Sequence, residues 1–104
     1  METYDVTIPV LVAVTALPGA VFWRQNCGTF RSMDGRRVIQ ATSIDGLGDI
    51  MGGYRGYPVA IETKARLGKL RTTQKTFREN WEKAGGVYIV TRSPEDALSS
   101  LSML

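Results

Sequence analysis

The chain has 104 residues, of which 43% are hydrophobic and 22% charged, as expected for one globular domain over residues 1–104. It has no histidine and one cysteine, which excludes Ser-His and Cys-His catalysis, zinc sites of the usual ligand number and a disulfide framework. Any chemistry must therefore use carboxylates, amines, guanidinium groups, amides and hydroxyls, with or without a metal ion, and a reducing cytoplasm is the expected location.

The net charge of +3 is unevenly distributed along the chain. Between Arg55 and Arg78 there are seven basic residues and one acidic residue, Glu62. A second basic group is opposed only by Asp34 and consists of Arg24, Arg31, Arg36 and Arg37. Mixed charge is usually only solvated surface, but segments of one sign favour a polyanion such as nucleic acid as a partner.

The first element, over residues 5–16, is ambiguous between strand and helix. Apolar β-branched residues alternate from position 6 to position 14, as in a strand, whereas Leu11 and Ala13 make the remaining positions apolar as well. Pro9 fits the first turn of a helix but not its middle. The apolar run ends at Leu17, is too short to span a bilayer and lacks the basic start of a signal peptide.

A series of short strands follows this element. Residues 21–25 (VFWRQ) predict one strand, and residues 37–40 predict another after the turn Met33-Asp34-Gly35, because Asp-Gly is a strong hairpin signal. Residues 50–51 and 59–62 predict two more, with Gly52-Gly53 and Arg55-Gly56 turning between them.

From Thr72 the apolar period becomes helical. The stripe of this helix contains Gln74 and then Phe77, Trp81 and Ala84, and Gly85-Gly86 predict its left-handed C-terminal cap. Residues 87–90 (VYIV) predict a buried strand. A last helix begins after Ser93, with a proline at its first position and buried leucines at 98 and 101. This order of elements predicts a mixed α/β domain.

The residues with the clearest chemical potential lie in the stretch 46–64 (GLGDIMGGYRGYPVAIETK). Asp49 closes a glycine-rich turn, and the apolar run before Glu62-Thr63-Lys64 predicts a strand on which Glu62 and Lys64 share one face. The two carboxylates, a backbone carbonyl and waters could bind Mg²⁺, with Lys64 beside the attacking water or the phosphate. The alternative is a turn aspartate and an exposed ion pair, since acid-any-lysine alone is common by chance.

Other polar and aromatic residues also have two interpretations. Gln74 either faces water at a helix start or points into a site. The aromatic rings of Trp23, Phe77 and Trp81 are expected in the core rather than as base-stacking platforms. The segment Arg24-Gln25-Asn26 either approaches a phosphate or merely ends a strand.

Several of these segments, in this order, resemble the virus-type replication-repair nuclease (VRR-NUC) domain, a branch of the PD-(D/E)XK nuclease superfamily. The resemblance covers residues 23 to 101. It rests on Trp23-Arg24-Gln25-Asn26 with Gly28, on the box at 46–52 (GLGDIMG), on 60–64 (AIETK), and on Lys69-Leu70, Gln74 and Phe77. The closing segments 84–87 (AGGV) and 92–98 (RSPEDAL) complete it. It implies a restriction-endonuclease-like α/β core with a mixed central sheet flanked by helices.

Carried over to this chain, the resemblance makes Asp49 and Glu62 the metal ligands, together with the backbone carbonyl of Thr63. Lys64 is then the catalytic lysine and Gln74 an accessory site residue. Family members often add a glutamate from the first helix, for which Glu2, or Asp5 in its place, is the candidate. The residues expected to contact DNA are Arg24, Asn26, Arg31, Arg36, Arg37, Arg66, Lys69, Arg71, Lys75 and Arg78.

The function expected from the sequence is thus an Mg²⁺-dependent deoxyribonuclease, with Mn²⁺ as a substitute, that hydrolyses phosphodiesters in branched DNA. The resemblance also implies a homodimer similar to Holliday-junction resolvases, with the apolar first element in the interface, and a phage or prophage protein in a bacterial cytoplasm. The alternatives are a nuclease on flaps or ends of linear DNA and a non-cleaving nucleic-acid-binding module.

Overall fold

The computed structural model describes residues 4–25, 29–31, 38–40, 48–65 and 68–104, and side chains within 6–25, 48–65 and 68–104. Its helices are α1 (Tyr4–Thr15), α2 (Thr72–Lys83) and α3 (Pro94–Ser102). Its strands are β1 (Ala20–Arg24), β2 (Thr29–Arg31), β3 (Val38–Gln40), β4 (Ile50–Tyr54), β5 (Tyr57–Thr63) and β6 (Val87–Thr91). None of the helices in these ranges is long and apolar enough to cross a membrane.

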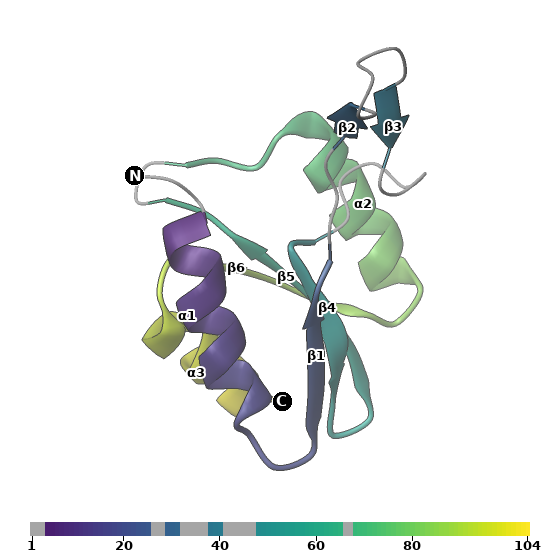
Figure 1. The fold of residues 1–104 in the computed structure, drawn as a ribbon. Helices are drawn as coiled ribbons and strands as arrows, with labels where there is room; N and C mark the ends of the chain where they lie inside the picture. Colours follow the sequence, from purple (N-terminus) through teal and green to yellow (C-terminus); the bar gives the residue numbers. More distant parts are fainter. Residues whose placement is uncertain (1–3, 26–28, 32–37, 41–47, 66–67) are drawn as a thin grey trace.

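The central sheet is mixed and has the strand order β1-β4-β5-β6. Strands β1, β4 and β5 form an antiparallel meander, and β6 runs parallel to β5 after a crossover through α2. Helices α1 and α3 lie on one face of the sheet and α2 lies on the other (Figure 1). The expectation of an α/β fold with a mixed sheet flanked by helices is confirmed at this level.

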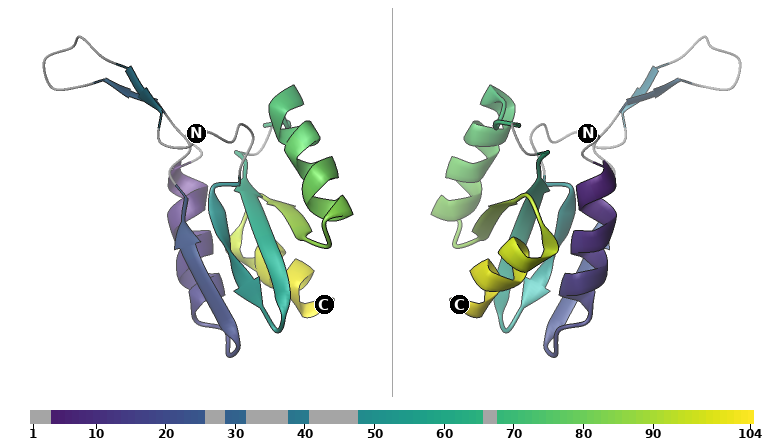
Figure 2. Two further views of the ribbon diagram at one scale, coloured as in Figure 1. Left: turned by 90° about the vertical axis from the view of Figure 1, so that its right-hand side faces the viewer. Right: turned by 90° about the vertical axis from the view of Figure 1, so that its left-hand side faces the viewer.

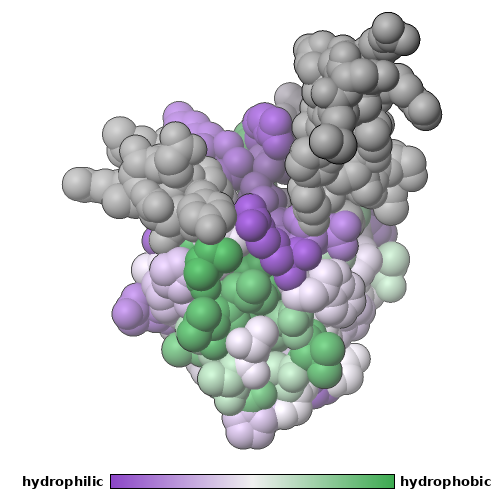
Figure 3. All heavy atoms as spheres, viewed as in Figure 1, coloured by the Kyte–Doolittle hydropathy of each residue, from purple (hydrophilic) through white to green (hydrophobic). Residues whose placement is uncertain are grey.

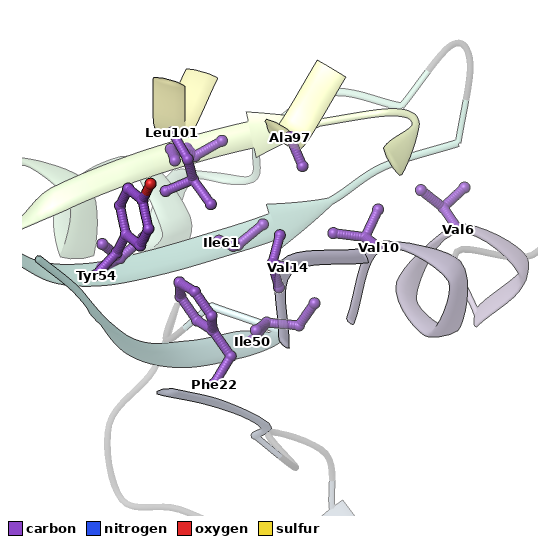
Figure 4. Packing of buried hydrophobic residues seen from close by; sticks show 11 residues of the cluster. Val6, Val10, Val14, Phe22, Ile50, Tyr54, Ile61, Ala97 and Leu101 are labelled. Carbon is purple, nitrogen blue, oxygen red and sulfur yellow. The ribbon is translucent and has the colours of Figure 1, made fainter. Parts of the chain in front are cut away.

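The first element, which the sequence left open, is a helix. Its valines at positions 6, 10 and 14 recur every four residues, so they lie on one helical face and are buried against the sheet and α3 (Figure 4). Pro9 lies inside α1, but its side chain is on the exposed side. Packing of the buried stripe therefore outweighs both the proline and the low helix propensity of the β-branched residues.

The main core fills the space between α1, α3 and the sheet. Strand β5 contributes Val59 and Ile61 to this core, and α3 contributes Ala97 and Leu101. A smaller cluster on the other face joins Met51, Ala60 and Tyr88 to the inner face of α2. The alternation along β5 thus divides its side chains between the two faces, as the sequence pattern predicted.

The expectation that Gly52-Gly53 would turn the chain is wrong, because both glycines lie inside β4. A Cβ at Gly52 would lie 2.0 Å from the Val21 carbonyl oxygen and 2.7 Å from the Phe22 ring, so only glycine allows β1 to approach this closely. The turn is Arg55-Gly56 alone, where both residues have positive φ, 50° and 88°.

The remaining predicted elements agree well with the structure. Gly85 has a φ of 96° after α2, and the Ser93 side chain accepts a hydrogen bond from the Asp96 N–H at the start of α3. Strand β3 lies where residues 37–40 were predicted to form a strand, and it pairs antiparallel with β2, which was not predicted, in a sheet of their own; the predicted turn at 33–35 lies outside the described residues.

Candidate active site

Four of the predicted site residues converge where β4 begins and β5 ends. Asp49 directly precedes β4, Glu62 and Lys64 lie at the end of β5, and Gln74 is in the first turn of α2. Lys64 Nζ lies 3.4 Å from Glu62 Oε1, and Gln74 Nε2 donates a hydrogen bond of 2.7 Å to the same oxygen. Gln74, 12 positions from Glu62 in the sequence, thus meets Lys64 at the Glu62 carboxylate.

Glu62 is the buried centre of this group, with an exposed fraction of 3%. Its Oε2 atom is buried and accepts no hydrogen bond from the described residues. Burial, and after it the neighbouring carboxylate of Asp49, raise the pKa of Glu62 to about 7 against the opposing effect of Lys64.

Gln74 links the helix start to the site through both ends of its amide group. Its Oε1 accepts the Arg71 backbone N–H at 2.8 Å, which caps the first turn of α2. This contact fixes the amide orientation and points Nε2 at Glu62. Gln74 is 2% exposed, so it does not face water at the helix start but points at Glu62.

Asp49 is held by Thr63, whose side chain the sequence interpretation did not include. Oδ2 of Asp49 accepts both the backbone N–H of Thr63, at 2.9 Å, and its hydroxyl, at 2.8 Å. Because the Thr63 hydroxyl donates to Asp49, the Thr7 hydroxyl of α1 must donate in turn to Thr63. The chain Thr7–Thr63–Asp49 fixes the first carboxylate from the far side of the sheet.

The sequence holds a signal for Thr63. It is the only polar position among the buried, core-facing residues 59, 61 and 63 of β5, and it is fully buried. A buried hydroxyl needs a hydrogen-bond partner, so a threonine at the core-facing position next to acid-any-lysine indicates a nearby acceptor. Nothing in the sequence indicated that Thr7 would supply the second contact.

The two carboxylates suit a hard divalent cation. Mg²⁺ commonly binds one or two carboxylates and keeps several water ligands, and the unpaired Oε2 of Glu62 offers an oxygen for such an ion. The described residues contain no cluster of three or more histidine, cysteine or acidic side chains. Glu2 lies outside the described residues, as does the side chain of Asp5, so the expected third carboxylate stays a prediction.

The predicted DNA-contacting residues fall into three groups. Exposed side chains belong to Arg24 at the end of β1 and to Lys69, Arg71 and Lys75 around the start of α2. Arg78, further along α2, pairs with Glu82 at 3.5 Å and lies 5.6 Å from the centre of the Tyr88 ring. The following predicted contacts lie outside the described residues or side chains: Asn26, Arg31, Arg36, Arg37 and Arg66.

The basic segment that begins at Arg55 does not form one surface. Arg55 lies in the turn between β4 and β5, and the seven residues of β5 separate it from the site by roughly 20 Å at about 3.3 Å per residue. Its guanidinium group lies 5.3 Å from the Tyr54 ring centre. The charge near the site therefore comes from the segment after β5 and from the end of β1.

The aromatic residues behave differently from one another. Phe77 and Trp81 pack into the smaller core with ring centres 5.5 Å apart, as predicted. The expectation for Trp23 is wrong, because it is 51% exposed on β1. The reason is that α2 packs beside β6, at the opposite edge of the sheet, so nothing in the described structure covers this side of β1 (Figure 2).

No protein-family model matches the sequence, and no curated protein matches it at a significant level.

Proposed function

We propose that the chain is a metal-dependent DNA endonuclease of the PD-(D/E)XK superfamily, similar to its VRR-NUC branch, that hydrolyses phosphodiesters in branched DNA. The observation that carries the proposal is the convergence of Asp49, Glu62, Lys64 and Gln74 on one buried site. A mixed sheet flanked by helices, with the acid-any-lysine residues at the end of its third strand in order, supports the restriction-endonuclease-like core that the resemblance implies.

The carboxylates of Asp49 and Glu62, with the backbone carbonyl of Thr63, would hold Mg²⁺ or Mn²⁺. When bound, the ion would lower the pKa of the attacking water and neutralise charge on the phosphate. The raised pKa of Glu62 fits this assignment, because a second positive charge near two carboxylates would remove their mutual repulsion and stabilise the ionised pair.

Lys64 would act on the phosphate and the water as a point charge. Its ammonium group contacts Glu62 at 3.4 Å and is only 13% exposed, so it is held at the site rather than free in solvent. From this position it can orient the attacking water by hydrogen bonding or stabilise negative charge that develops on the phosphate oxygens. Gln74 would keep Glu62 in one orientation and limit its rotation during the reaction.

DNA would approach the end of the domain where β1 ends and α2 begins. The space-filling view has hydrophilic residues in purple toward this upper end (Figure 3), where Arg24 and the basic residues before and within the first turns of α2 are exposed. Contacts of these cations with phosphates would supply affinity without sequence preference. Binding should therefore weaken as the salt concentration rises.

A homodimer would place two such sites about a two-fold axis, as paired nicks across a branched junction require. The outer side of α1 supports the earlier expectation for its interface: Val12 is 65% exposed, and apolar surface in green covers this side of the molecule in Figure 3. A helix that is apolar all round is normally covered on both sides. A monomeric mass by light scattering at micromolar concentration would contradict the dimer.

Nicking of a labelled four-way junction in Mg²⁺ or Mn²⁺ tests the proposal. Wild-type protein should cut the junction faster than a linear duplex or a flap, and Asp49→Asn and Lys64→Ala should not cut it. Equal activity of wild type and both variants would refute the site. Faster cutting of flaps or ends would favour the linear-DNA nuclease, and junction binding without cutting in either metal would favour the binding module.

A further inference from the structure

Trp23 is a large aromatic side chain on an open part of the sheet. It is 51% exposed and lies on β1, opposite Met51 of β4, on the side of the sheet where α2 packs. The left view of Figure 2 looks onto this side and has α2 beside β5 and β6, with β1 and β4 uncovered by it. Val21 is 68% exposed on the same side of β1, so the two side chains leave apolar surface open on this part of the sheet, and exposed apolar patches are where proteins bind partners.

The register of the strands places Trp23 close to the candidate active site. Its neighbour two residues on, Gln25, donates its backbone N–H to the Asp49 carbonyl at 2.7 Å. Continuing the pairing of β4 with β5 puts Asp49 opposite Glu62. The Trp23 position is thus two residues along β1 and two strands across from Glu62, roughly 12 Å from it at about 4.8 Å per strand and 3.3 Å per residue.

The indole ring is held in a fixed orientation. Its Nε1–H donates to Gln25 Oε1 at 3.2 Å, so the polar edge of the ring is already used within the protein. The ring faces are left to make contact with a partner. A flat, apolar partner that can stack satisfies them, whereas a partner that needs hydrogen bonds would gain little.

The charges around Trp23 favour nucleic acid as this partner over protein. Lys64, the cation of the site itself, lies on the same side of the sheet as Trp23, and Arg24 at the end of β1 is exposed on the other side. Aromatic rings combined with cationic side chains are the means by which proteins stack the bases of single-stranded nucleic acid. A base inside a continuous duplex has both faces covered, so only an unpaired or unstacked base fits.

We infer that Trp23 is a stacking platform for an unpaired nucleobase close to the phosphodiester that is cut. The inference rests on the proposed nuclease function and extends it, since the platform gives the enzyme a physical reason to prefer branch points and single-stranded segments over continuous duplex. Trp23 is a specificity-determining residue in this account and takes no part in the hydrolysis.

Binding measurements without divalent metal test the platform. The probes are a four-way junction with unpaired thymines at the branch and a fully paired duplex of the same length. Trp23→Ala should weaken junction binding about 5- to 100-fold, the range for loss of one stacked base, and leave duplex binding nearly unchanged. Trp23→Phe should retain most of the affinity. Val21→Ala is the matched control, because Val21 is 68% exposed on the same strand and points the same way, but is farther from the site.

Indole fluorescence gives a second readout that does not depend on cleavage. The junction should quench wild-type fluorescence, and the quenching should disappear in Trp23→Phe, which keeps the partly buried Trp81. A ratio of junction to duplex affinity that is unchanged in Trp23→Ala would overturn the platform. So would an altered oligomeric mass of Trp23→Ala with unchanged DNA binding, because this face would then be a protein interface.

The platform and the nuclease activity can be refuted separately. Wild-type protein that cuts the junction while Trp23→Ala binds and cuts it equally well would refute the platform and leave the nuclease. Wild-type protein that binds the junction through Trp23 without cutting it would refute the nuclease and leave the platform on a binding module. Absence of binding to either DNA would refute both.

Discussion

One face of the central sheet holds the main core of the domain, and the other face holds the candidate active site. On the face of α1 and α3, side chains from both helices and all four strands close over Ile50 and Ile61, which are fully buried. On the face of α2, the helix covers only one edge, so Trp23 stays exposed, and Lys64 keeps some contact with solvent beside the buried Glu62. Strand β5 contributes to both, with Ile61 on one side and Glu62 on the other.

The closed face, on the side of α1 and α3, stabilises the domain. This stability allows the open face, on the side of α2, to hold a buried carboxylate that is unfavourable for folding. A buried carboxylate beside a second carboxylate costs free energy, which the apolar burial of the other face must offset. Changes at the site should then alter activity with little loss of stability, and changes on the closed face should do the opposite.

The largest expected effect is on activity, at the open face. Asp49→Asn removes one charge from the site while the new amide oxygen can still accept the Thr63 hydrogen bonds. Junction cleavage should fall by about 10³-fold, as when a preorganised charge contact in an active site is lost, with the thermal midpoint hardly changed. Asp96→Asn, an exposed carboxylate at the start of α3, is the matched control and should cleave normally. A large drop in the thermal midpoint of Asp49→Asn would break the distinction between the faces.

The next effect is the pH dependence that Glu62 imposes on stability. Its pKa is 4.5 in the unfolded chain and about 7 in the folded protein, so the folded state binds the proton more tightly. Stability without metal should therefore fall as pH rises from about 4.5 to about 7, by about 3 kcal/mol in total, and then level off.

Urea unfolding at a series of pH values measures this slope, and Glu62→Gln should flatten it. Mg²⁺ binding should show the reverse trend and tighten as pH rises toward 7, because the ion must displace the proton. A stability curve that is flat over this range in the wild type would show that Glu62 is ionised throughout.

Substitutions at two adjacent glycines of β4 allow the two faces to be compared directly. A Cβ at Gly52 points toward the closed face and meets the Val21 carbonyl oxygen at 2.0 Å, whereas a Cβ at Gly53 points toward the open face and meets only the Tyr57 carbonyl oxygen, at 3.4 Å. Gly52→Ala should destabilise the domain by about 2 kcal/mol and Gly53→Ala by much less. Thermal or urea unfolding of both variants measures the difference, and equal losses would mean that β1 can shift away freely.

The smallest predicted effect is that of a change at Thr63. Its side chain lies on the closed face, but its hydroxyl donates a hydrogen bond to Asp49 of the candidate site. Thr63→Val keeps the shape and removes two hydrogen bonds, so stability should fall by about 1 kcal/mol and Mg²⁺ affinity by about tenfold. Calorimetric titration with Mg²⁺ measures the second effect. Thr91→Val is the control, since Thr91 is equally buried beside Thr63 on β6 and its hydroxyl hydrogen-bonds Ser93 rather than Asp49. Equal affinities of the two variants would contradict a positioning role for Thr63.

Local signals predicted the element types correctly wherever those signals agreed with one another. The helical stripe after Thr72, the cap at Gly85, the Ser93-Pro94 start of α3 and the alternation of β5 were all predictable, because each depends on residues within a few positions of one another. The same alternation placed Glu62 and Lys64 together, and the position of Gln74 on the stripe of α2 made it a candidate.

The type of the first element, the contacts of Asp49 and the exposure of Trp23 depend on long-range packing instead. Whether residues 4–15 form a helix depended on a core into which Val10 and Val14 could pack, and local propensity favoured no single answer. The contacts of Asp49 with Thr63 and the exposure of Trp23 depend on which strands pair and on which edge α2 covers. Those are long-range contacts, and a sequence pattern encodes the face on which a residue lies but not what lies opposite it.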